Sequence, residues 1–214
     1  MAAHIPQRLR HTLLGIVNRP YLSSALAHAK RPLIVHISDT PRMSYPFVYR
    51  VARLLRPEYL IHTGDIVDDI KLENRPGEID AYRNVVAGFL SRLEATPAGA
   101  IYLVPGNHDV RAILEGSSSR AVTVPEGARL HLAGLSISVS HHYDPTVTGG
   151  LADSEFYLYG HTPSPDHHRQ DNTQCLNGIS TVTVIEVPTR SLHMLPYPAG
   201  TDSVRKLLLL KPGL

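Results

Sequence analysis

The chain has 214 residues, and its 21 Lys plus Arg against 19 Asp plus Glu give a formal net charge of +2 with histidine neutral. This near balance excludes a large field of one sign, so the chain carries no strong signal for nucleic acid or a membrane surface. Hydrophobic residues make up 43% of it, which excludes intrinsic disorder as the main state, and no apolar run reaches the ~20 residues that span a bilayer. One cysteine, Cys175, excludes an intrachain disulfide and a zinc site made of cysteines alone. We therefore expect a soluble, cytoplasmic protein.

Three elements are predicted near the start of the chain. Apolar residues at helical spacing indicate a short amphipathic helix within a leader segment, residues 1–31. The β-branched run at 33–37 predicts a strand that is buried on both faces. Apolar positions over 47–55 then repeat with the helical period, and Ser44 is a candidate cap and Pro57 a candidate stop for that helix.

The alternation of strand and helix continues through the first half. Residues 59–62 form a second buried run, and a second helical pattern extends from Ile79 to Leu93 before Pro97. A third buried strand is predicted at 100–104. The order strand–helix–strand–helix–strand is typical of a parallel α/β sheet, in which ligands bind at the carboxyl ends of the strands.

The second half changes to a period of two. Apolar and polar residues alternate over 135–139, 156–159 and 181–184, and a further short strand is predicted at 192–194. These patterns indicate half-buried strands, which we expect to be largely antiparallel.

The chain shows no clear linker, so we expect one domain. This domain is placed at residues 32–200, between the leader segment and a tail at 201–214. The apolar run from Leu207 to Leu210 in the tail is too short for a membrane anchor and is expected to dock on the protein.

Chemistry-bearing side chains follow predicted strands in five separate segments. A hard divalent cation prefers carboxylate and amide oxygens, and a borderline cation also accepts imidazole nitrogens. If the strand ends meet at one rim, these side chains can share an ion. The segments are Asp39, then 64–68 with Gly-Asp-x-x-Asp, 106–109 with Gly-Asn-His-Asp, 140–142 with Ser-His-His, and 160–163 with Gly-His-Thr-Pro.

This order of motifs resembles the calcineurin-like metallophosphoesterase superfamily, in particular its small, single-domain, bacterial phosphodiesterase-like branch. The resemblance runs from about residue 32 to about residue 187, and the segment from Asn177 to Ser180 is similar to a turn found in the small members. It implies an α/β fold, a four-layer α/β/β/α sandwich of two mixed sheets flanked by helices.

The resemblance also implies roles for individual residues. Asp39 is expected to bind metal one, and Asp65 is expected to bridge metals one and two. The remaining ligands of metal two are implied to be Asn107, His141 and His161.

Further residues are expected around these ligands. His142 is the fallback for His141, and Asp68 is a tentative member of the site. His108 is expected to protonate the leaving group or steady the transition state, with Asp109 orienting it.

Four other residues have two interpretations each. Arg42 and Lys71 are candidates to meet a substrate phosphate, with surface charge as the default interpretation. His36 and His62 lie inside predicted strands, where core packing is favoured over a hydrogen bond that supports a ligand.

Two positions depart from the family pattern. Pro41 and Pro163 stand where the family usually has histidines, and both histidines belong to metal one. Proline offers no side-chain lone pair, so metal one keeps only Asp39 and Asp65.

Three outcomes are open for metal one. The favoured one is a weak, water-rich site for a hard ion such as Mg²⁺ or Mn²⁺. The others are an empty site with Arg42 supplying the charge, or recruitment of another ligand among His142, Asp166, His167 and His168.

Two functions from different classes follow from the resemblance. The leading hypothesis is a metal-dependent phosphoesterase that hydrolyses a phosphomonoester or phosphodiester through attack by metal-activated hydroxide. The alternative is a catalytically silent scaffold on the same fold, as in the retromer subunit of the family.

The expected cofactor is a divalent metal, with Mn or Mg preferred and Fe, Zn or Ni as alternatives. The expected partner is a phosphorylated substrate of unknown identity. The oligomeric state is not indicated.

Overall fold

The computed structural model describes residues 19–144, 146 and 153–205. The predicted amphipathic helix of the leader falls on residues before 19, and the apolar tail falls on residues after 205. Both therefore lie outside the described residues. None of the helices in the described ranges is long and apolar enough to cross a membrane.

The first sheet has six strands in the order β11-β10-β1-β2-β3-β4. Strands β1 to β4 run parallel to one another, while β10 is antiparallel to both β1 and β11. The parallel α/β prediction for the first half is therefore confirmed. The strands are β1 Leu33–Ile37, β2 Tyr59–His62, β3 Ala100–Leu103, β4 Val122–Thr123, β10 Val182–Glu186 and β11 Leu192–Leu195.

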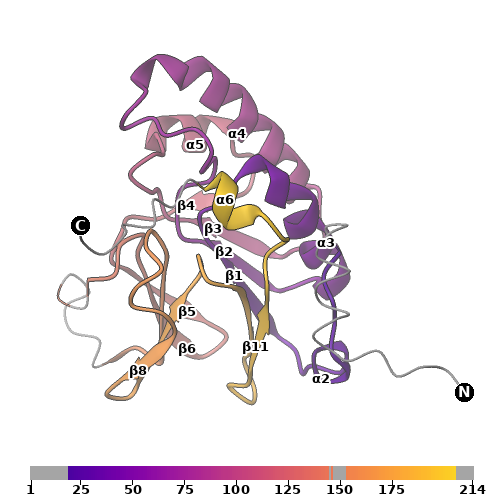
Figure 1. Cartoon of the computed structure of the whole chain (residues 1–214). Helices are drawn as coiled ribbons and strands as arrows, with labels where there is room; N and C mark the ends of the chain where they lie inside the picture. The colour runs from indigo at the N-terminus through magenta and orange to yellow at the C-terminus, as the bar shows by residue number, and fades with distance from the viewer. Residues whose placement is uncertain (1–18, 145, 147–152, 206–214) are drawn as a thin grey trace, which may run out of the picture.

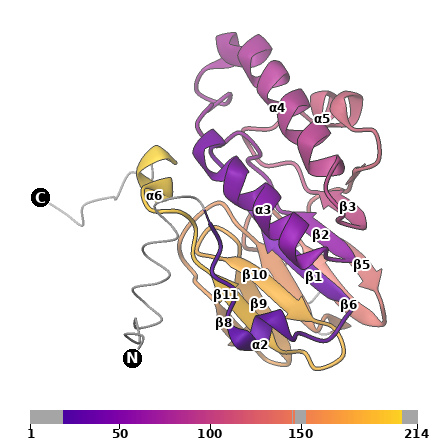
Figure 2. The same cartoon turned by 90° about the vertical axis from the view of Figure 1, so that its right-hand side faces the viewer.

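Helices α3, α4 and α5 lie together on one side of this sheet (Figures 1 and 2). Helix α3 ends at Leu55, and the next residue, Arg56, has a left-handed backbone with φ of 47° just before Pro57. The Ser44 hydroxyl donates to the Pro41 carbonyl instead of capping α3. Ile79 is 38% exposed, so it lies outside the apolar face predicted for α4. The helices, with short 3₁₀ turns, are α2 Ser24–Ala27, η1 Arg42–Ser44, α3 Tyr45–Leu55, η2 Pro76–Glu78, α4 Ile79–Glu94, α5 Arg111–Ser117 and α6 Thr201–Val204.

The second sheet has five strands in the order β5-β6-β7-β9-β8. Hairpins pair β5 with β6 and β8 with β9, but β6, β7 and β9 run parallel. The expectation of largely antiparallel pairing is therefore wrong for the centre of this sheet, where the connections cross over instead of forming hairpins. The strands are β5 Ala128–Leu132, β6 Leu135–Val139, β7 Phe156–Tyr159, β8 His168–Gln170 and β9 Thr173–Asn177.

An aliphatic core holds the two sheets face to face. Ile34 and Ile61 of the first sheet belong to the same buried cluster as Ile137 and Leu158 of the second. Strand β7 is buried on both faces because its tyrosines form a separate cluster with Tyr143. The predicted α/β architecture of two mixed sheets flanked by helices is confirmed. Among the described residues, α3 to α5 cover the six-stranded sheet, and tyrosine rings pack on the five-stranded one.

Candidate metal centre

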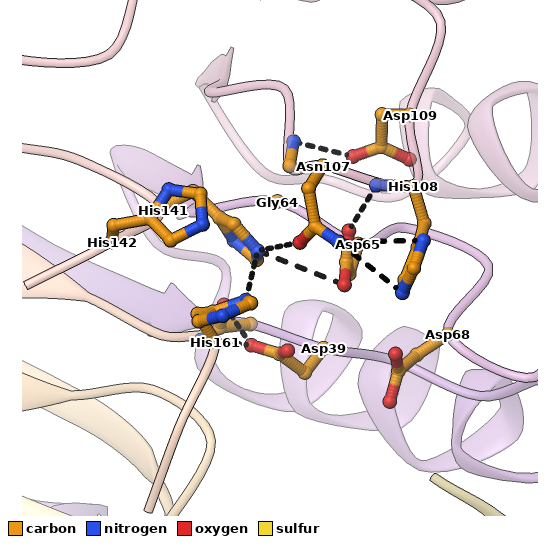
Figure 3. Close-up of polar contacts among 12 residues, drawn as sticks. Asp39, Gly64, Asp65, Asp68, Asn107, His108, Asp109, His141, His142 and His161 are labelled. Atoms are coloured by element: carbon orange, nitrogen blue, oxygen red, sulfur yellow. Dashed lines mark hydrogen bonds and ion pairs between the residues drawn. The ribbon is translucent and has the colours of Figure 1, made fainter. Parts of the chain in front are cut away.

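Five loops from the two sheets meet at one end of the sandwich, as Figure 3 shows. The loops after β1, β2 and β3 come from the first sheet, and those after β6 and β7 come from the second. The structure brings together all five side chains that the sequence motifs single out as ligands. These are Asp39, Asp65, Asn107, His141 and His161.

Tight backbone turns aim these side chains into the centre. Asp39, Asp65 and His161 all have left-handed backbones, with φ of 51°, 53° and 69°. Such conformations are costly for residues other than glycine and persist only where the surroundings enforce them. The loops after β1 and β2 are joined because the Asp39 N–H donates to the Gly64 carbonyl at 2.9 Å and the Thr40 N–H to the Asp65 carbonyl at 3.0 Å.

His141 is the buried centre of the group. Its Nδ1 lies 2.7 Å from the Thr63 carbonyl oxygen, which can only accept, so Nδ1 carries the proton and donates. In the neutral ring, Nε2 is then a bare lone pair. It lies 3.1 Å from Asn107 Oδ1, 3.2 Å from His161 Nδ1 and 3.6 Å from Asp65 Oδ2.

Asn107 is oriented by a residue that the motifs did not single out. Its Nδ2 donates to the Glu73 carboxylate at 2.7 Å, which leaves Oδ1 directed at His141. Asp65 is fixed in turn by the His108 backbone N–H, which donates to Oδ1 at 3.0 Å. Glu73 lies in the loop between β2 and α4, and its role was not recognisable from the sequence because it depends on a contact with a distant loop.

Asp39 and His161 are tied to each other through the backbone. The His161 N–H donates to Asp39 Oδ2 at 3.0 Å, and the Ser38 hydroxyl donates to the same oxygen at 2.6 Å. The loop of His161 is held by Asn177, which donates to the carbonyls of Thr162 and Pro165 at 2.7 and 2.9 Å. The motif around Asn177 therefore shapes the loop that presents a candidate ligand.

The donor atoms fit a divalent cation. Ligand atoms of Asp39, Asp65 and His141 lie within 4.8 Å of one another, and so do those of His141, His142 and His161. The lone pairs of these donor atoms point toward one another, which is unfavourable unless a cation lies between them. Burial and then the Asp39 charge raise the pKa of Asp65 well above its usual range. The mixture of carboxylate, amide and imidazole donors suits a divalent cation of borderline hardness.

Asp68 lies beside this group and is also buried. Burial and then the neighbouring Asp39 raise its pKa to about 7, in spite of an ion pair with Lys71. The carboxylates of Asp39, Asp65 and Asp68 are thus buried close together, and they need positive charge nearby to remain ionised together.

His142 lies at the rim, where its backbone N–H and its ring both contact Glu126, at 2.7 and 2.9 Å. Its ring packs against that of His161 with centroids 4.2 Å apart. The more deeply buried His141 contacts Asn107 and Asp65, so the structure favours His141 over its neighbour as the isolated histidine of the pattern.

His108 and Asp109 do not interact as expected. The Asp109 carboxylate accepts from the Gly106 N–H at 2.9 Å, the Ile66 N–H at 3.1 Å and the Tyr82 hydroxyl at 2.8 Å. It therefore shapes the two loops and does not orient the His108 ring directly. The His108 ring lies near Asn107 Nδ2, at 3.3 to 3.4 Å, and burial followed by the Lys71 charge lowers its pKa to about 4.

His62, at the end of β2, supports the loops that carry Asp39 and Asp65. Its Nε2 contacts the Thr40 hydroxyl at 2.8 Å, and its Nδ1 accepts from the Gly64 N–H at 3.2 Å. Burial lowers the pKa of His62 to about 3, so the ring is neutral. His36 contacts the Thr63 hydroxyl at 2.9 Å and leaves its Nδ1 without a partner.

The contacts of His167 and His168 bear on the alternative in which metal one recruits another ligand. Both ring nitrogens of His167 are used by Thr181 and by the Asn177 N–H, each at 3.0 Å. His168 contacts Tyr143 at 3.1 Å and donates to the Asp166 carbonyl at 2.8 Å. The ring nitrogens of these two histidines are therefore engaged in contacts other than those of the candidate ligands.

Two arginines near the centre are already engaged. Arg42 pairs with Asp69 at 2.5 Å and its side chain is 57% exposed. These observations favour the interpretation of Arg42 as a surface charge. The buried Arg205 was not anticipated from the sequence. Its guanidinium donates to the carbonyls of Asp39 at 2.7 Å and Ile179 at 2.6 Å, which braces the loop after β1.

A family comparison gives the class of protein. The model of the calcineurin-like phosphoesterase family matches residues 32–193, most of the chain. The chain therefore belongs to the calcineurin-like phosphoesterase family. No curated protein matches the chain.

The chain is also similar to several solved structures. An archaeal phosphodiesterase superposes with a TM-score of 0.52 at 16% identity, covering 75% of this chain and 97% of its own. Yfce, a phosphoesterase from E. coli, gives 0.48 at 15% identity, covering 78% and 99%. Vacuolar protein sorting 29 from Cryptosporidium parvum gives 0.42 at 16% identity, covering 75% and 94%. At 16% identity, the likeness to the archaeal phosphodiesterase supports the fold alone.

Proposed function

We propose that the protein is a metal-dependent phosphoesterase that hydrolyses a phosphomonoester or a phosphodiester. The observation that carries this proposal is the position of His141, whose bare Nε2 lies within 3.6 Å of Asn107, His161 and Asp65 donor atoms. A scaffold has no evident need for such a cluster of buried lone pairs.

The ligands proposed for the strong site are Asp65, Asn107, His141 and His161. When bound there, a divalent cation lowers the pKa of water and draws negative charge from phosphoryl oxygens. We propose Mn²⁺ or Mg²⁺, and the two imidazoles favour Mn²⁺ of the pair. Asp39 supports the site through the His161 backbone and offers a further carboxylate on the side of metal one.

The chain's own groups then position the substrate and move a proton. His108 lies beside Asn107, and we propose that it donates a hydrogen bond to the leaving oxygen. Its pKa of about 4 describes a ring without substrate, and a phosphate dianion next to it favours the protonated form. Asp109 holds the backbone of the loop that carries this histidine.

We also propose a cytoplasmic location. The one cysteine, Cys175, is a buried free thiol, and such a thiol is compatible with a reducing compartment.

Hydrolysis of p-nitrophenyl phosphate and bis-p-nitrophenyl phosphate, with added Mn²⁺ or Mg²⁺ and with a chelator, tests the proposal. Wild type is expected to hydrolyse at least one of the two only when metal is present. Asp65→Asn is expected to lower turnover by about 10³-fold, the scale of lost electrostatic stabilisation at an active site.

Asp80→Asn is the matched control because Asp80 is exposed in the first turn of α4. It is expected to behave as wild type. Absence of hydrolysis under every metal, or full activity of Asp65→Asn, would favour the silent scaffold.

A further inference from the structure

The structure leaves a shortage of positive charge on the side of metal one. Asp39, Asp65 and Asp68 are each at most 2% exposed. Pro41 and Pro163 supply no ligand there, and a divalent ion at the strong site offsets only two of the three carboxylates. One further positive charge is needed for the group to be ionised without net charge.

Three basic side chains lie close enough to be considered, and two are engaged elsewhere. Arg205 is wholly buried, with its guanidinium on the carbonyls of the loop after β1 and over the Tyr197 ring at 4.4 Å. Its charge is offset by Asp202, with which it pairs at 2.9 Å. Arg42 points to the surface, where it pairs with Asp69. Neither can contact a ligand that enters the centre from solvent.

Lys71 is the third, and it pairs with a member of the carboxylate group. Its ammonium pairs with the buried carboxylate of Asp68, while its own side chain remains 25% exposed. The Lys71 charge also lowers the pKa of Asp65, His108 and His161, which come from three different loops. The ammonium is therefore bound to one of the three buried carboxylates and is still reachable from solvent.

The remaining hydrogen-bonding capacity of Lys71 suits an anion. An ammonium has three N–H donors, and Asp68 accepts from one of them. The other donors are available to a phosphoryl oxygen that lies against the strong metal site.

We infer that Lys71 takes the place of the second metal ion and contacts the phosphoryl group of the substrate. This inference rests on the proposed function, and it makes the protein a one-metal phosphoesterase with a built-in cation. One divalent ion and one ammonium together balance the three carboxylates.

The test uses the full chain, Mn²⁺ and inorganic phosphate as the probe. Lys71→Gln keeps a donor for Asp68 and removes the charge, and Lys71→Arg keeps the charge. Arg75→Gln is the matched control, since Arg75 is an exposed cation in the same loop that pairs with Glu78. Calorimetry measures phosphate binding at one equivalent of Mn²⁺, and electron paramagnetic resonance at excess Mn²⁺ distinguishes single ions from adjacent pairs.

Wild type is expected to hold one magnetically isolated Mn²⁺ and to bind phosphate. Lys71→Gln should hold Mn²⁺ equally well but bind phosphate about tenfold more weakly, the scale of one lost charge-assisted contact. Lys71→Arg should recover most of the affinity, and Arg75→Gln should equal wild type. Unchanged phosphate affinity in Lys71→Gln, or an adjacent Mn²⁺ pair in wild type, would overturn the inference.

The two proposals fail in different ways. If wild type hydrolyses phosphoesters and Lys71→Gln binds phosphate as well as wild type, only the assignment of Lys71 is wrong. If wild type neither hydrolyses phosphoesters nor binds phosphate in the presence of metal, the proposed function itself is wrong.

Discussion

Single residues near the centre act by fixing the orientation of a neighbour. His141 is held in one tautomer by the Thr63 carbonyl, and Asn107 is held in one amide orientation by Glu73. Partners of this kind determine metal affinity because they direct lone pairs toward the ion before it binds. Sequence motifs singled out His141 and Asn107 but not Glu73, whose contact joins two loops across 34 positions of the chain.

Loss of the Glu73 carboxylate is expected to weaken metal binding. In Glu73→Ala the Asn107 amide is free to rotate, and Mn²⁺ affinity measured by calorimetry should fall about tenfold or more. Glu73→Gln keeps an acceptor and should lie near wild type. Glu78→Ala, an exposed acid paired with Arg75, serves as the control. Equal Mn²⁺ affinity in Glu73→Ala and wild type would show that Asn107 needs no such partner.

Strand ends and loops are the elements that create the site. The loops after β1 and β2 are joined through backbone hydrogen bonds, and His62 connects Thr40 to the turn at Gly64. Gly106 lets the loop after β3 approach closely, because a Cβ there would overlap the carboxylate and backbone nitrogen of Asp65. The spacing of strands and motifs predicted these loops correctly, since each follows a buried strand of a parallel sheet.

Substitution of Gly106 separates the role of the loop from general stability. Gly106→Ala should displace Asp65 and weaken Mn²⁺ binding by more than about tenfold, because the new methyl group has no free volume. Gly116→Ala in α5 is the matched control, since nothing lies within 4 Å of the added carbon. It should bind Mn²⁺ as wild type does and gain about 0.5 kcal/mol or more of stability from helix propensity. Full Mn²⁺ affinity in Gly106→Ala would contradict the close packing described for this loop.

At the scale of the whole molecule, two sheets with different patterns combine into one site. The first sheet and its helices were predicted from the buried runs and the helical period. The parallel centre of the second sheet was not, because alternation along β7 reflects two buried faces, aliphatic and tyrosine, and not one wet face. Arg205, whose contacts are tertiary, carries no local signal, and the sequence offered Lys71 only as a phosphate-binding candidate with surface charge as the default. The candidate ligands could be placed together from the sequence because each motif marks the end of a strand.

Buried histidine also links stability to pH. The unfolded chain protonates His62 near pH 6.5, whereas the folded chain does so only near pH 3. The stabilising contribution is therefore complete above pH 6.5 and falls as the pH decreases, by about 1.4 kcal/mol per unit for one fully linked proton. Asp68, with its pKa raised to about 7, acts in the opposite sense.

A comparison of wild type with a His62 variant isolates the contribution of this histidine to the pH dependence of stability. The difference in unfolding free energy between metal-free wild type and His62→Gln, measured by urea denaturation, should shrink as the pH falls from 6.5 to 5. A difference that stays constant over this range would show that His62 is not held neutral in the folded state.

Anomalous diffraction from a crystal soaked in Mn²⁺ tests the central proposal most directly. The proposed function predicts a strong anomalous peak in direct contact with Asp65, Asn107, His141 and His161. Data with no anomalous density among those four side chains, at Mn²⁺ concentrations that support hydrolysis, would contradict it.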